Sequence, residues 1–97
     1  MYRAFVYIMT NKPHGVLYTG MCNETLIRRI WQHRTKAIRG FTAKHNCTRL
    51  VYYEAHDHVT LAAERERRMK RWHRAWKIEL IESINLDWRD LYEDLTV

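Results

Sequence analysis

The sequence predicts a mixed α+β fold whose elements follow the order strand, strand, helix, strand, helix, helix. Three observations lead to this prediction. The chain has 97 residues, which suffice for one hydrophobic core but not two, so residues 1–97 are expected to form one domain. Hydrophobic residues make up 46% of it, with one proline and three glycines, unlike a disordered chain. Short β-branched and aromatic runs alternate with stretches whose apolar residues recur every three to four positions.

The first two strands are expected to form a hairpin. Residues 5–10 are a run of large apolar and β-branched side chains, and residues 16–19 resume that pattern. The segment between them, residues 11–15, is rich in turn-forming residues. A third strand is expected over residues 50–55, which are apolar or aromatic on both faces, as in a strand that lies centrally or under a helix.

The first helix is expected over roughly residues 24–38, with Asn23 or Thr25 as its N-cap and a loosening of the chain near Gly40. The side chains that recur at helical spacing are Leu26, Ile27, Ile30 and Trp31.

A second helical pattern begins at Thr60, which can act as an N-cap, and runs to about Ser83. No glycine or proline interrupts it, so one helix or two are both compatible with it, and a break near residues 73–77 would have to come from tertiary packing. Trp76 lies on the apolar line of this pattern and is expected in the core, whereas Trp72 suits either the core or base stacking. The other members of that line are Ala62, Met69 and Leu80.

Charge is distributed unevenly along the chain. The formal net charge is +6, which favours polyanionic partners such as nucleic acid. Residues 1–78 hold 16 basic and 5 acidic side chains, whereas residues 79–97 hold 1 and 6. Residues 86–97 are expected to form a short helical end to this acidic segment. The segment could fold back on the basic body, or be no more than a solvated surface.

Several other classes of protein are disfavoured. No window approaches 18 apolar residues and the start lacks a signal-peptide pattern, so a cytoplasmic location without a membrane partner is expected. A basic amphipathic stretch at residues 60–78 would suit an anionic membrane, but the acidic segment follows it directly. Cys22 and Cys47 are expected as free thiols, and without paired metal-ligand spacings no structural zinc is expected.

Two tyrosines are the first candidates for chemistry. Tyr7 and Tyr18 lie on the two strands of the expected hairpin, so strand pairing could bring their hydroxyls together. Tyrosines in strands also pack their rings and hydrogen-bond their tips without any further role.

A cation and an imidazole share one face of the first helix. Arg29 and His33 are four residues apart, so an arginine that can hold phosphate projects beside a histidine that can pass a proton. Two polar residues at this spacing also occur on ordinary solvated faces. Arg28 and Arg34 would add unspecific affinity for phosphate.

One carboxylate lies at the margin of an apolar helix face. Glu66 is about 60° from Met69 around the helix and is therefore expected to be partly shielded. Lys70 is placed to pair with it. The alternative interpretation is a ligand for magnesium or manganese, which take one or two carboxylates and leave other positions to water and phosphate.

Together these features resemble the GIY-YIG nuclease family, specifically its short, stand-alone bacterial members. Residues 6–8 and 18–20 fall where the two name-giving triplets lie, and residues 26–33 are similar to the family's helix motif. Further similar segments of the short branch are residues 40–44, 50–54, 63–66 and 85–91. Val6 and Thr19 replace the Gly and Ile of the triplets, and His45 stands where the short branch usually has Tyr.

The resemblance implies a three-stranded antiparallel sheet with flanking helices. It also implies metal-dependent hydrolysis of DNA phosphodiester bonds, branched or single-stranded DNA included, in DNA repair or processing. Tyr7 or Tyr18 would help to activate water, Arg29 would stabilise charge on the phosphate, and His33 would assist. A tyrosine is a poor base at neutral pH unless nearby cations lower its pKa, which Arg29 and the metal ion could do.

Glu66 would hold one divalent ion, magnesium or manganese, and Asn85 matches the family's late asparagine less securely. The basic residues assigned to nucleic-acid binding are Arg28, Arg34, Lys44, Arg65 and Lys70. A catalytically silent nucleic-acid-binding module with the same fold is the alternative function.

Overall fold

The computed structural model describes residues 3–95 and contains a three-stranded antiparallel sheet, which confirms the predicted α+β class. The strands are β1 (Ala4–Thr10), β2 (Leu17–Cys22) and β3 (Arg49–His56). Their order is β2-β1-β3, so β2 is an edge strand and β1 is central. The predicted hairpin is formed by β1 and β2, and its second strand runs to Cys22 instead of ending at Thr19.

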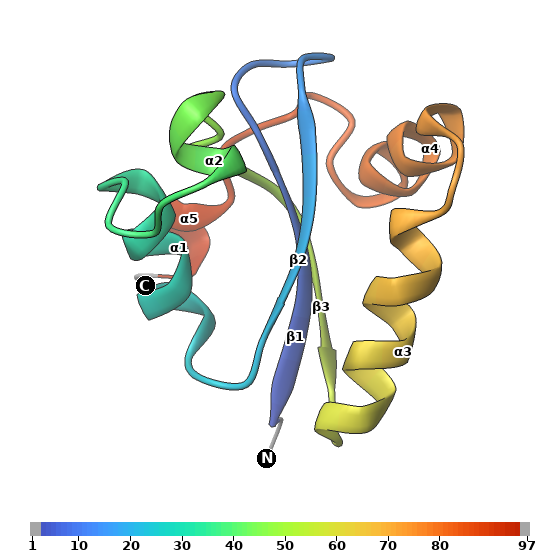
Figure 1. The fold of residues 1–97 in the computed structure, drawn as a ribbon. Helices are drawn as coiled ribbons and strands as arrows, with labels where there is room; N and C mark the ends of the chain where they lie inside the picture. The colour runs from blue at the N-terminus through green and yellow to red at the C-terminus, as the bar shows by residue number, and fades with distance from the viewer. Residues whose placement is uncertain (1–2, 96–97) are drawn as a thin grey trace.

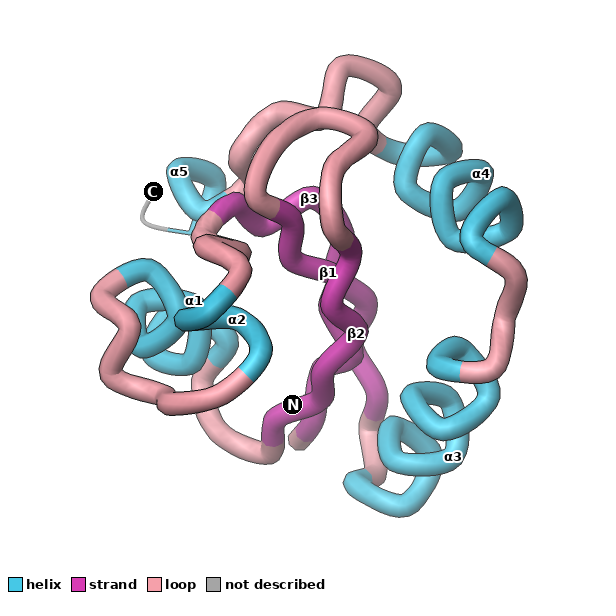
Figure 2. The backbone as a smooth tube through the Cα atoms, turned by 45° about the horizontal axis from the view of Figure 1, so that its top comes forward, coloured by secondary structure: helices cyan, strands magenta, loops and turns pink. Residues whose placement is uncertain are grey.

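The helices lie in two layers, one on each face of the sheet (Figures 1 and 2). One layer contains α1 (Leu26–Arg34), α2 (Phe41–Lys44) and α5 (Tyr92–Leu95). The other contains α3 (Val59–Lys70) and α4 (Arg74–Ile84). The main elements follow the predicted order, and α2 is an addition to it. No helix within residues 3–95 has the length and apolar character that a membrane crossing requires.

The central strand β1 builds a core on each face of the sheet. Val6 and Ile8 are buried in the core on the α3–α4 side, whereas Tyr7 and Met9 are buried in the core on the α1 side. Successive side chains of a strand point to opposite faces, so a continuously apolar strand serves both cores.

The third strand is covered by helices but is not central. β3 occupies the edge opposite β2 and contacts both α3 and α4. Its pairing with β1 shifts between Ile8, which faces Tyr52, and Met9, which faces Leu50. Val51 is therefore the extra residue of a β-bulge.

The first helix is shorter than predicted. Thr25 occupies the N-cap position, and α1 ends at Arg34 instead of continuing to residue 38. Lys36 has a left-handed backbone with φ of 59°, and the Lys36 and Ala37 amides bond back to the last turn, an arrangement that terminates a helix. Trp31 was expected on the buried face but is 53% exposed.

The long helical pattern of the sequence is divided into two helices. α3 ends at Lys70 and α4 starts at Arg74, and the N-cap position of α3 is His58, not Thr60. α3 packs on all three strands, whereas α4 packs on β3. The apolar residues that would form one line along a continuous helix therefore no longer share one face after the break. Trp76 is consequently 54% exposed, contrary to its predicted place in the core. Trp72 packs against the core on the α3–α4 side.

Part of the acidic C-terminal segment is built into the fold. Trp88 and Leu91 are buried, one in each core, as the chain passes from the α4 side of the sheet to the α1 side (Figure 1). Asp90 forms an ion pair with Arg34, so this carboxylate folds back on the basic body. The predicted helical end is present as α5, and residues 96–97 lie outside the described part of the chain.

Candidate functional site

The two tyrosines meet on the α1 side of the edge strand. Tyr7 pairs with Gly20 and Met9 pairs with Tyr18 in the β1–β2 register, so both tyrosines point to the same face. Their ring centroids are 6.4 Å apart. Strand pairing thus brings the two rings together, while the expectation that it also joins their hydroxyls stays a prediction.

Gly20 allows the Tyr7 ring to lie across β2. A Cβ atom at Gly20 would be 2.6 Å from both Cζ and the hydroxyl oxygen of Tyr7, and 2.8 Å from the Tyr18 ring. These separations are shorter than any van der Waals contact of carbon. The absence of a side chain at this position therefore brings the Tyr7 hydroxyl to the outer edge of the sheet.

His33 links the Tyr7 hydroxyl to α2. Its Nε2 lies 2.8 Å from the Tyr7 hydroxyl and its Nδ1 lies 2.9 Å from Oγ1 of Thr42. His33 and Thr42 are both buried, at 2% and 3% exposure. Sequence reasoning did not find Thr42, because nothing in the local pattern indicates that α2 packs on the histidine.

Burial determines the protonation states of this pair. It raises the pKa of Tyr7 above its usual range, and the neighbouring Arg29 only partly opposes that rise. Arg29 thus lowers the Tyr7 pKa, as expected of a nearby cation, but the effect of burial is larger. Burial, with a further contribution from Arg29, lowers the pKa of His33 to about 4. At neutral pH a phenol thus faces a neutral imidazole.

Arg29 lies where β2 passes into α1. Its Nη1 donates to the Met21 carbonyl at 3.1 Å, and its Nε lies 3.4 Å from Oε1 of Glu24. These contacts hold the guanidinium on the same side of the sheet as Tyr7, whose pKa it lowers, and as His33, whose pKa it also lowers. The predicted pairing of a cation and an imidazole on one helix face is present.

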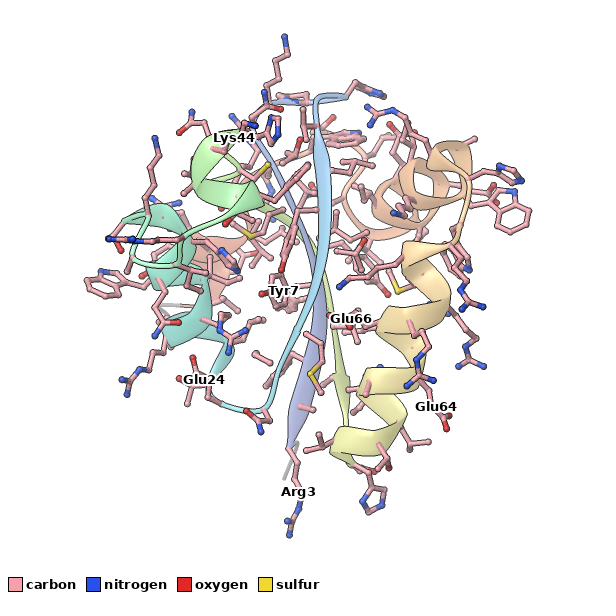
Figure 3. The ribbon with its side chains drawn as sticks, in the orientation of Figure 1. Arg3, Tyr7, Glu24, Lys44, Glu64 and Glu66 are labelled. Atoms are coloured by element: carbon pink, nitrogen blue, oxygen red, sulfur yellow. The ribbon has the colours of Figure 1, made fainter. Side chains whose placement is uncertain are left out.

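Glu66 approaches the same edge from the other layer. Figure 3 shows Tyr7 on the α1 side of β2 and Glu66 on the α3 side, with Glu66 directed from α3 towards the strands. The Glu66 side chain is 25% exposed, and its Oε2 lies 3.5 Å from Nζ of Lys70. The predicted partial shielding and the predicted ion pair are both confirmed.

A hollow of about 260 Å³, here called the edge hollow, joins the two layers at β2. Its lining residues are Leu17, Tyr18, Thr19, Phe41, Lys70 and Lys77. Tyr18 and Phe41 come from the layer that holds Tyr7 and His33, whereas Lys70 neighbours Glu66. The edge hollow is therefore lined by Tyr18 from one layer and by Lys70, the ion-pair partner of Glu66, from the other.

The donor chemistry at Glu66 fits a hard divalent cation. Within residues 3–95 no group of three or more histidine, cysteine, aspartate or glutamate side chains is arranged to hold a metal ion. A single carboxylate is a sufficient protein ligand for magnesium or manganese when water and substrate phosphate supply the other oxygens. Glu66, which is 25% exposed and forms an ion pair with Lys70, has the chemistry of such a ligand.

The predicted nucleic-acid-binding residues divide into two groups. Arg28 and Lys44 are exposed, and Lys70 lines the edge hollow. Arg34 is bound to Asp90 and lies over the Tyr92 ring, and Arg65 is bound to Glu54 at 3.1 Å and lies over the Trp72 ring. The last two arginines have intramolecular partners that a phosphate would have to displace.

Asn85 lies at β3, the edge opposite the tyrosines. Its Nδ2 donates to the carbonyls of Val51 and Arg89, and its Oδ1 accepts from the Arg89 amide. Asn85 thus bonds the carbonyl of Val51, the extra residue of the β-bulge. Its bonds to Arg89 stabilise the turn in which Trp88 has a left-handed φ of 57°. The structure does not bring this predicted site residue to the β2 edge.

The fold and the site together define a small α+β domain in which a tyrosine–histidine–arginine cluster faces a lone carboxylate across an edge strand. The model of the GIY-YIG catalytic domain matches residues 3–79, which include this whole cluster and exclude Asn85. The chain therefore belongs to the GIY-YIG family, whose members are nucleases that act on DNA and generally use a divalent metal ion. Comparisons with curated proteins and with solved structures gave no significant match.

Proposed function

We propose that this protein is an endonuclease that hydrolyses DNA phosphodiester bonds with magnesium or manganese, at the β2 edge between Tyr7 and Glu66. The observation that carries the proposal is the hydrogen bond of 2.8 Å between the Tyr7 hydroxyl and Nε2 of a neutral, buried His33. This pair, next to Arg29, supplies a proton acceptor beside a cation, which hydrolysis of an anionic ester requires.

Tyr7 and His33 would move the proton of the attacking water. A protonated Tyr7 that donates to Nε2 leaves its oxygen lone pairs free to accept from water, and places the imidazole proton on Nδ1, facing Thr42. As the water oxygen bonds to phosphorus, the bond from phosphorus to the leaving oxygen breaks, the water proton passes to the Tyr7 oxygen and the Tyr7 proton passes to Nε2. The leaving oxygen departs as an alkoxide and takes a proton from solvent water. The negative phosphate offsets the charge of Arg29, which makes His33 a better acceptor in the complex than in the free protein.

Arg29 and Glu66 have different duties in this proposal. The Arg29 guanidinium would bind a phosphate oxygen and stabilise the charge that grows on it in the transition state. Glu66 would hold the divalent ion, which when bound supplies further positive charge to the phosphate and the leaving oxygen. Tyr18, whose ring lies 5.7 Å from that of His33, would close the solvent side of the pair.

The test is a cleavage assay on supercoiled, single-stranded and branched DNA with magnesium or manganese. We expect metal-dependent nicking by the wild type, lost by at least about a hundredfold in Glu66→Ala and Arg29→Ala. DNA binding should persist in Glu66→Ala, because removing a carboxylate does not weaken attraction for a polyanion. Removal of metal by a chelator should abolish nicking and leave binding in place.

Glu64→Ala is the matched control. Glu64 lies on the same helix, is exposed, and points outward from α3, away from the strands (Figure 3). Its loss should leave nicking unchanged. If the wild type binds every substrate and cuts none, the protein is a binding module with this fold, and the catalytic proposal fails.

A further inference from the structure

The edge hollow has an aromatic wall whose outer residue, Phe41, takes no part in the proposed reaction. Phe41, the first residue of α2, is 46% exposed, and its ring stacks on Tyr18 with centroids 6.0 Å apart and planes inclined by 25°. The His45 ring lies 4.3 Å from the Phe41 ring. A row of rings thus runs outward from the tyrosine–histidine cluster, and the Phe41 ring within it is open to solvent.

The opposite wall carries uncompensated positive charge. Lys77 has no carboxylate partner within residues 3–95, and burial together with the charges of Lys70 and Arg74 lowers its pKa. Arg74 donates to the carbonyls of His14 and Gly15, which leave its charge unneutralised. Arg74 and Lys77 also line an adjoining hollow of about 350 Å³. Like charges held together in this way are stabilised by a bound anion.

A buried hydroxyl lies between these two walls. Thr19 lines the edge hollow, is 3% exposed, and its Oγ1 has no hydrogen-bond partner within the described chain. A buried hydroxyl without a partner is costly, and a ligand in the hollow would satisfy it.

We propose that the edge hollow binds one unpaired nucleotide of a DNA strand, next to the phosphate that is cut. Its base would stack on Phe41, and its phosphate would lie between Lys77 and Lys70 with Thr19 as a further donor. The inference rests on the proposed function, which defines the strand that crosses β2. A base stacked on Phe41 has left its own duplex, so the preferred substrate is single-stranded or locally unpaired DNA.

The test is the binding of a short labelled oligothymidine and of a duplex of equal length, both in a chelator so that neither is cut. Phe41→Leu should weaken single-strand binding by about tenfold, the usual effect of losing one stacked base, and change duplex binding less than about twofold. Phe41→Trp should retain the preference for single strands. Lys77→Gln should lower the salt dependence of single-strand binding by roughly one phosphate contact.

Two substitutions serve as matched controls. Trp31, on α1, is 53% exposed and lies outside the edge hollow, so Trp31→Leu tests the loss of an exposed aromatic side chain elsewhere. Lys12 is an exposed lysine of the β1–β2 turn, so Lys12→Gln tests the loss of one charge. Neither should alter the preference for single strands.

The proposal is overturned if Phe41→Leu weakens single-strand and duplex binding equally, or leaves both unchanged. Because the assay measures binding without cleavage, its outcome is separate from that of the nuclease proposal. A protein that cuts DNA but shows no effect of Phe41 disproves the nucleotide subsite alone. One that selects single strands through Phe41 but never cuts disproves the nuclease alone.

Discussion

The hydroxyl of Tyr7, on the central strand, lies 2.8 Å from Nε2 of His33, on the first helix, although 26 residues separate them along the chain. The contact joins a phenol whose pKa is raised by burial to an imidazole whose pKa is lowered by burial. Each side chain therefore depends on the other to satisfy a polar atom inside the core.

Tyr7→Phe should separate catalysis from folding. The ring stays in place, so we expect a loss of about 1 kcal/mol in the free energy of unfolding. Nicking should fall by at least about a hundredfold, because no hydroxyl remains to accept the water proton. Tyr53→Phe is the control, since Tyr53 pairs with Tyr7 across the sheet and is only half-buried. Equal nicking by both variants would remove Tyr7 from the mechanism.

His33 should make stability depend on pH. Its pKa is about 4 in the folded state against an ordinary value of 6.5, so the unfolded chain binds more protons between these values. Stability is then greatest above pH 6.5 and falls as the pH decreases towards 4. The loss between pH 7 and pH 5 should be about 2 kcal/mol.

Urea unfolding of the wild type and of His33→Gln, each at several pH values, measures how much His33 contributes to the pH dependence of stability. Glutamine does not titrate, so the variant should lack the part of the pH dependence that His33 contributes, while the carboxylate contributions cancel in the comparison. Identical slopes against pH in the two proteins would contradict a buried neutral His33.

Gly20→Ala should displace the Tyr7 ring. The added methyl group would lie 2.6 Å from Tyr7 Cζ, so the ring or the edge strand must move, at a cost of about 1–3 kcal/mol in stability and with loss of nicking. Tyr7→Leu removes the two nearest obstructing atoms and leaves the contact of 2.8 Å with the Tyr18 ring. In a double-mutant cycle Gly20→Ala should therefore be less destabilising in the Tyr7→Leu background. Strictly additive effects would show that the two residues are not in steric conflict.

Asn85→Ala should reduce stability and spare the reaction. It leaves the Val51 carbonyl and the Arg89 amide without their partner, which should cost about 2–4 kcal/mol in urea unfolding. Nicking at a temperature well below unfolding should change less than about threefold. Asn23→Ala, at an exposed position, is the control and should change neither stability nor nicking. A loss of nicking with unchanged stability would assign Asn85 to the reaction centre after all.

Much of the fold was predictable because its signals are local. The β-branched runs around Tyr7 and Tyr18 indicate strands, and the apolar spacing of Leu26 and Ile30 indicates a helix, since each depends only on neighbours a few residues away. The wrong prediction that Trp76 lies in the core has a non-local cause. The sequence between α3 and α4 contains no helix-breaking residue, and the break follows from how each helix packs on the sheet.

By itself the sequence determined the element order, the basic character of the body and the residue types available for the site. Only the tertiary structure decided that Thr42 supports His33, that Glu66 reaches β2 from the face opposite Tyr7, and that Asn85 serves the β3 edge. The physical reason is that propensity and periodicity act over a few residues, whereas these contacts join segments that meet only when both cores have formed.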